Sequence, residues 1–135
     1  MTAEQFFTRY AALSMGDDDR SMAELYAPSF FVAGPKGSMV FPNDARFVEW
    51  LTQMRAFNRQ HRMRAIAPAA VRETVLSPIH VLAYVRWSAR FEKTGDRAVE
   101  FDIAYLIERA DESWRVLGYV SERDQEEEMR ALGLL

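Results

Sequence analysis

The chain has 135 residues, of which 49% are apolar and 27% charged, a composition typical of one globular domain over residues 1–135. Its net charge of −3 is not the basic excess expected of a nucleic-acid-binding protein. Because the chain contains no cysteine, disulfides, thiol nucleophiles and thiolate metal sites are excluded. Neither a signal-peptide pattern nor a membrane-spanning apolar stretch is found, so we expect a cytoplasmic protein that binds neither nucleic acid nor membranes.

Two helices are predicted at the start of the chain. Thr2 and Gln5 form a capping box for a helix over residues 2–15. The acidic run 17–19 then suits the positive end of a second short helix better than a metal site. This helix must end before Pro28, which cannot continue it. The side chains that it would bury are Met22, Leu25 and Tyr26.

A third, longer helix is predicted from its cap, Asn43, to about Met63. One arc of this helix at 100° per residue is mainly apolar and indicates the buried side. The arc consists of Phe47, Trp50, Leu51, Met54, Phe57, Asn58 and His61. The opposite side carries arginines at positions 55, 59 and 62. These arginines either bind an anion or pair with acids elsewhere, such as the run 126–128.

The strands are predicted from a change of period. Residues 29–41 read as a short hairpin around a Gly-Pro-Lys-Gly turn. After Ile66 the apolar period changes from 3.6 to 2, and hairpin-length turns join successive antiparallel strands. These strands are expected at about 66–76, 79–92, 98–109 and 113–121. A last short helix, capped by Ser121, should end at Gly133. Helices on one side of one sheet make an α+β arrangement.

Element order and two short motifs carry a family resemblance. The sequence Tyr-Ala-Ala-Leu-Ser-Met-Gly-Asp at residues 10–17 and Asp-Glu-Ser-Trp-Arg-Val at residues 111–116 resemble the nuclear transport factor two-like superfamily. That group includes polyketide cyclase (SnoaL-like) and ketosteroid isomerase relatives. The resemblance implies a cone-shaped fold in which a curved antiparallel sheet wraps the long helix, with a pocket at the open end, commonly in a homodimer.

The resemblance does not extend to the reaction of the ketosteroid isomerases. Matching their pattern places Arg9 where those enzymes have a catalytic tyrosine, with Tyr10 one residue away. Gly34 stands at the position of the base, and Ala104 at the late acidic position, with Asp102 two residues before it. The sequence therefore argues against steroid-type isomerisation by that mechanism.

His61 and Asp102 are the candidate catalytic pair. A histidine on a buried arc is either a general base or a core or rim residue with a structural partner. Asp102 either pairs with His61 or Arg86, with a raised pKa in a pocket, or belongs to a solvated strand face. The candidate ligand-binding residues are Tyr10, Trp50, Met54, Trp87 and Tyr119. No metal-ligand spacing, phosphate loop or nucleophile elbow is found, so we expect no metal and no cofactor.

Two functions are compatible with this pattern. The first is a mainly apolar pocket of a few hundred cubic ångströms for a small apolar or aromatic molecule, with or without acid–base chemistry of the isomerase, dehydratase or cyclase type. The second is a non-catalytic homodimerisation or protein-interaction module with a plugged pocket. A homodimer is expected because one layer of helices covers only one face of the sheet. Apolar side chains on the other face include Leu82, Tyr84, Leu106 and Leu117.

Overall fold

A computed structural model describes residues 1–124, 127, 130–131 and 133. The helices are α1 (Ala3–Met15), α2 (Asp19–Ala23) and α3 (Ala45–Gln60), with a short 3-10 turn at Glu92–Thr94. The strands are β1 (Tyr26–Gly34), β2 (Gly37–Pro42), β3 (Met63–Val75), β4 (His80–Phe91), β5 (Val99–Ala110) and β6 (Ser113–Ser121). None of the described helices is long and apolar enough to span a membrane.

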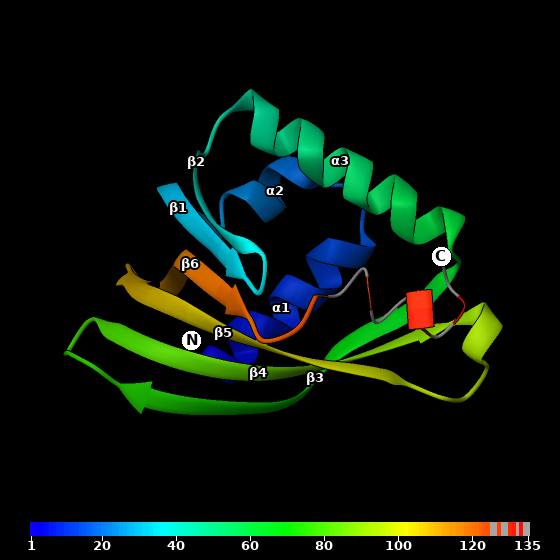
Figure 1. The fold of residues 1–135 in the computed structure, drawn as a ribbon. Coiled ribbons are helices and arrows are strands. Elements are labelled where there is room, and N and C mark those ends of the chain that lie inside the picture. Colours follow the sequence, from blue (N-terminus) through cyan, green and yellow to red (C-terminus); the bar gives the residue numbers. More distant parts are fainter. Residues whose placement is uncertain (125–126, 128–129, 132, 134–135) are drawn as a thin grey trace.

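The strands form one curved sheet in the order β2-β1-β6-β5-β4-β3. The helices lie on its concave side, with α3 running across the opening (Figure 1). The predicted α+β cone is thus confirmed, with the meander β3 to β6 antiparallel throughout. One pair departs from the expected antiparallel order, since β1 runs parallel to β6. It does so because α3 separates the β1–β2 hairpin from the meander in the chain, and the hairpin joins the far edge of β6.

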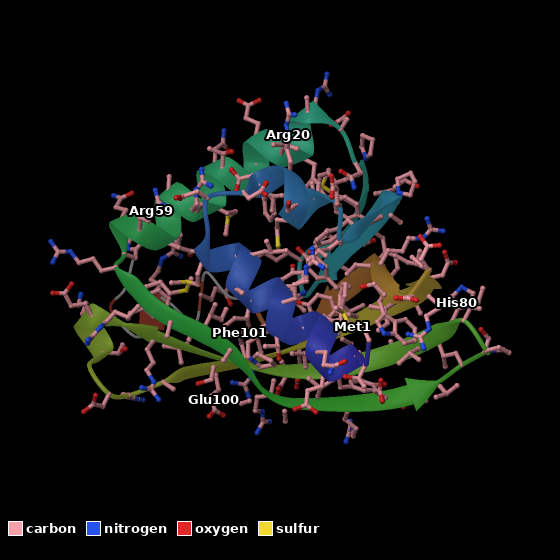
Figure 2. The ribbon with its side chains drawn as sticks, turned by 180° about the vertical axis from the view of Figure 1, so that it is seen from behind. Met1, Arg20, Arg59, His80, Glu100 and Phe101 are labelled. Carbon is pink, nitrogen blue, oxygen red and sulfur yellow. The ribbon has the colours of Figure 1, made fainter. Side chains whose placement is uncertain are left out.

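Apolar and polar residues alternate along β4 and β5, and the apolar ones lie on the buried face of the sheet. On β4 the apolar series that includes Val85 and Trp87 is buried, with exposed fractions of 1% and 2%. On β5, Phe101 and Glu100 point to opposite sides of the sheet, Phe101 toward the helices (Figure 2). The concave face and α1 thereby share one core, in which Phe6 and Phe7 are fully buried.

Several predicted boundaries were wrong. Tyr26 belongs to β1, not to the second helix, because its backbone pairs with Val116 of β6. The cap of α3 is Asp44, whose Oδ1 accepts a hydrogen bond from the Arg46 N–H at 2.9 Å. Asn43 instead donates through Nδ2 to the carbonyl of Ala23 at 2.8 Å. The predicted helix from 121 to 133 falls partly on residues 125–126, 128–129 and 132, which lie outside the described residues.

Each of the three aspartates of the acidic run 17–19 has a structural partner. Asp18 caps α2, since its Oδ1 accepts from the Ser21 N–H at 3.0 Å. Asp19 lies 3.1 Å from Arg55 of α3, and Asp17 pairs with Arg59. Arg55 and Arg59 are therefore paired with acids elsewhere, as one alternative expected, and their partners belong to the run 17–19. Arg62, which follows α3, lies 3.0 Å from Glu92, and residues 126 and 128 of the expected partner run lie outside the described residues. Among the described residues, no cluster suited to a metal ion is found.

Candidate functional site: a tyrosine-floored cavity in the cone

A cavity of about 220 Å³ lies between the helices and the concave face of the sheet. Helices α1, α2 and α3 and strands β3 to β6 all contribute to its wall. Its lining includes all five predicted ligand-binding residues: Tyr10, Trp50, Met54, Trp87 and Tyr119. The lining also includes residues that were not singled out from the sequence, among them Asn58, Phe101 and Tyr105. The inward alternation of β5 was the signal for Phe101 and Tyr105.

The predicted catalytic pair does not form in this cavity. His61 follows the last residue of α3, and its backbone N–H bonds the Phe57 carbonyl at 3.0 Å. Its ring lies 4.3 Å from the Phe57 ring, beside a surface hollow shared with Glu92 and Lys93. Because the helix ends at Gln60, the arc that predicted a buried His61 does not continue to that position.

Asp102 lies on the outer face of the sheet. Its carboxylate accepts hydrogen bonds from Arg86 Nε at 3.0 Å and Nη2 at 3.2 Å. The Arg86 hydrogen bond lowers the pKa of Asp102, opposite to the rise expected of a buried acid. Asp102 shares its strand parity with Glu100, which points away from the helices (Figure 2). The structure therefore shows the solvated strand face that was one alternative for Asp102, with Arg86 as its partner there, and the pocket carboxylate with a raised pKa was wrong.

Two hydrogen bonds lie on the floor of the cavity. The indole N–H of Trp87 donates to the Tyr105 hydroxyl at 3.0 Å, and the hydroxyls of Tyr10 and Tyr26 are joined by a short hydrogen bond. The rings of Tyr10 and Tyr105 pack against each other, with their centroids 5.8 Å apart. Burial raises the pKa of all three tyrosines, so the phenols are neutral donors at pH 7.

Counting the polar hydrogens of these four groups leaves two without an acceptor. Trp87 and the three tyrosines supply one polar hydrogen each, but only two hydrogen bonds join them. Tyr26 is 6% exposed and does not line the cavity. Leaving its hydroxyl hydrogen unpaired would bury it without a partner, at a cost of about 1–3 kcal/mol. The favoured arrangement therefore has Tyr26 donate to Tyr10, which leaves the hydroxyl hydrogens of Tyr10 and Tyr105, two residues that line the cavity.

The rest of the wall adds the polar groups of Asn58, Ser14 and Tyr119. Burial raises the pKa of Tyr119, and its hydroxyl has no hydrogen-bond partner among the described residues. The Ser14 hydroxyl donates its hydrogen to the Ala11 carbonyl at 2.7 Å, so it has no hydrogen to donate to a ligand. No Asp, Glu, His, Lys or Arg is among the described residues that line the cavity. The site can bind an apolar molecule and donate hydrogen bonds to it, but it has no group ionised at neutral pH.

A second polar network lies on the outer face, away from the cavity. Ser77 Oγ lies 2.8 Å from His80 Nδ1, and His80 Nε2 lies 3.0 Å from Glu108 Oε2. Arg115 Nε donates to Glu108 Oε1 at 2.8 Å. Ser77 Oγ also accepts the backbone N–H of His80 at 3.0 Å. The network fastens the β3–β4 hairpin, where His80 lies (Figure 2), to β5 and β6.

Glu108 should make the fold sensitive to acid. Hydrogen bonds from Arg115 and then His80 lower the pKa of Glu108. A carboxyl whose pKa is lower in the folded state contributes stability above its unfolded pKa, which is about 4.3. That contribution is lost as the pH falls through the folded value. We expect the melting temperature to fall between about pH 5 and pH 3, and to fall less steeply in Glu108→Gln. If the melting temperatures of the wild-type protein and of Glu108→Gln fell equally steeply between about pH 5 and pH 3, this assignment would be wrong.

Comparisons with known proteins identify relatives of the whole chain. A family model described as "NTF2-like protein (DUF6841)" matches residues 2–124. No curated protein matches the chain. An NTF2-like protein with a cystatin-like fold from Novosphingobium aromaticivorans has a solved structure that is 16% identical, with a TM-score of 0.65, over 96% of this chain and 84% of that one.

Two further solved structures are similar to this chain. A putative scytalone dehydratase from Novosphingobium aromaticivorans is 14% identical, with a TM-score of 0.61, over 87% of this chain and 78% of that one. A hypothetical protein with a ketosteroid isomerase-like fold from Catenulispora acidiphila, in complex with trimethylamine, is 12% identical, with a TM-score of 0.59, over 99% and 96%. At these identities the likeness shows the fold alone.

Proposed function

The chain belongs to the NTF2-like protein family DUF6841, and on this premise we propose that its cavity binds a small, mainly apolar molecule that carries one hydrogen-bond acceptor oxygen. The hydroxyl hydrogens of Tyr10 and Tyr105, which have no acceptor on the cavity floor, carry this proposal. An apolar wall gives affinity, and a few polar groups fix the orientation of the ligand. The acceptor oxygen would lie against Tyr10 and Tyr105, within reach of Tyr119 on the same wall.

The size and charge of the cavity narrow the ligand class. Its volume of about 220 Å³ is below the roughly 300–1,000 Å³ of pockets for drug-sized ligands, which favours a one- or two-ring molecule. Burying a localised carboxylate without a cation is costly, and no cation is among the described lining residues. A neutral carbonyl is therefore the favoured acceptor.

The same features favour binding without acid–base chemistry. General acid–base catalysis needs a group whose pKa lies near the working pH, and burial moves the pKa of the cavity tyrosines further from neutrality. His61 and Asp102, which were expected to supply such a group, lie outside the cavity. The free volume also favours ligand binding over an interaction module with a plugged pocket.

A matched pair of probes tests the proposal. 2-Acetylnaphthalene and 2-isopropenylnaphthalene have the same shape but differ in an acceptor oxygen, and binding of either should quench the fluorescence of Trp50 and Trp87, which line the cavity. The ratio of the two affinities should shift against the ketone by about 3- to 10-fold in Tyr10→Phe/Tyr105→Phe, as expected for one lost hydrogen bond. Binding of the hydrocarbon should be retained, which also shows that the variant is folded.

Tyr26→Phe is the control. It removes a hydroxyl from the same cluster of tyrosines, yet the hydroxyl hydrogens of Tyr10 and Tyr105 are still left for the cavity, so the affinity ratio should stay at the wild-type value. If neither probe binds the wild-type protein, the proposed binding function is wrong. If both bind but the double variant has an unchanged ratio, the cavity binds ligands without the proposed hydrogen bond.

A further inference from the structure

Strand β2 is an unprotected edge of the sheet. All six of its residues are exposed, and the exposed fractions of Met39 and Val40 are 63% and 73%. The strand contains no charged residue. Edge strands are usually blocked by charge, bulges or proline because their free backbone groups pair with other chains, and here only Pro42 at the end of β2 serves that purpose. Such an edge is suited to pairing with another strand.

The register shows which backbone groups are free. The Asn43 N–H bonds the Pro28 carbonyl at 2.8 Å, in line with the β1–β2 pairing of Phe30 with Phe41. Because hydrogen-bonded pairs alternate along an antiparallel ladder, Met39 and Phe41 direct their backbone groups toward β1. The outer edge therefore presents the N–H and C=O of Ser38 and Val40 and the C=O of Pro42.

We propose that β2 pairs with β2 of a second copy of this chain, antiparallel, about a two-fold axis at Val40. Each Val40 would exchange two hydrogen bonds with its counterpart, and each Ser38 N–H would donate to the Pro42 carbonyl of the other copy. Because Pro42 has no N–H, it adds no unpaired backbone donor to this interface. The two sheets would continue into one another.

Side chains favour this register and this partner. It places Met39 of one copy opposite Phe41 of the other, covering the apolar side chains that the edge exposes. It also brings Lys36, which lies in the turn before β2 and is 71% exposed, to the same end of the pairing as the exposed Asp44 that follows β2 of the other copy. Lys36 already lies 2.8 Å from Asp124, and its ammonium group has three hydrogens. An in-register parallel pairing would bring Lys36 against Lys36, so the charges select the antiparallel arrangement.

A single cysteine tests the pairing directly, because the chain has none of its own. Directly opposed residues of a hydrogen-bonded antiparallel pair have Cα atoms about 5.5 Å apart, within the range of a disulfide. Val40→Cys should therefore form a disulfide-linked dimer on mild oxidation at micromolar concentration. Ser38→Cys is the matched control on the same edge: its counterpart lies several residues away along the strand, so it should stay monomeric on a non-reducing gel.

Sedimentation of uncrosslinked protein completes the test. The wild-type chain should sediment at about twice 15.6 kDa, and Val40→Lys, which places two like charges at the axis, should sediment as a monomer. A wild-type monomer would overturn the proposal and leave the edge for a different partner. A wild-type dimer that Val40→Lys leaves intact and Val40→Cys does not crosslink would also overturn it. Crosslinking through Val120→Cys, on the outer face, would then assign the dimer to that face.

Discussion

Replacing Phe7 with alanine should lower the free energy of unfolding by about 3–5 kcal/mol. Phe7 is fully buried, and its ring lies within 6.2 Å of the rings of Tyr10, Trp87 and Tyr105. The substitution therefore removes the transfer energy of the ring, opens a cavity at the contact between α1 and the sheet, and breaks aromatic contacts. Equilibrium denaturation in urea measures the loss.

Phe57→Ala is the matched control for this prediction. Phe57 is only half-buried at the cavity wall, so less surface is returned to water and the loss should be well below that of Phe7→Ala. Equal losses in the two variants would show that α1 is not the centre of the core. Because Phe7 contacts the tyrosine floor, Phe7→Ala should also weaken hydrocarbon binding, whereas Tyr26→Phe should not.

The fold could be predicted from the sequence because its main signals are local. The alternation along β4 and β5 follows directly from burial of one face, and the capping box at Thr2 is satisfied on both sides in the structure. The boundaries of the helices and strands were predicted less accurately, because they depend on contacts with residues far away in the chain. Tyr26 is suitable for a helix or a strand, and its pairing with Val116 of β6 decides the outcome.

The site was predicted in part for the same reason. The five candidate ligand-binding residues lie on faces that periodicity identifies, and all of them line the cavity, while ligand binding by them stays a prediction. The prediction that His61 and Asp102 both face the cavity was wrong, because periodicity states neither where a helix ends nor which strand face meets the helices. The tyrosine cluster of Tyr26, Tyr10 and Tyr105 comes from β1, α1 and β5, and no local pattern in the sequence connects these residues. The homodimer expected through the outer face, where Tyr84 is 38% exposed, is untested, and it is the alternative to edge pairing that Val120→Cys distinguishes.

Gly118 should be the glycine least tolerant of a side chain. A Cβ atom added there would lie 2.1 Å from Cδ1 and 2.4 Å from Cγ of the Phe31 ring. These distances are far shorter than any real contact, and Cγ is the ring atom nearest the backbone, so a small rotation of Phe31 cannot relieve the overlap. Gly118→Ala should therefore lower the free energy of unfolding by about 1–3 kcal/mol or more, as overpacking does.

Two further variants establish that the Phe31 ring is the cause. Gly16→Ala adds a Cβ whose nearest neighbour is 3.6 Å away, at a negative φ of −90°, so its stability should be unchanged or slightly higher. Phe31→Ala loses its own packing energy, but in that background the cost of Gly118→Ala should largely disappear. The two substitutions would then be strongly coupled in a double-mutant cycle. If their costs simply add, Gly118 is required by the bend of β6 where it pairs with β1, and not by the ring that crosses it.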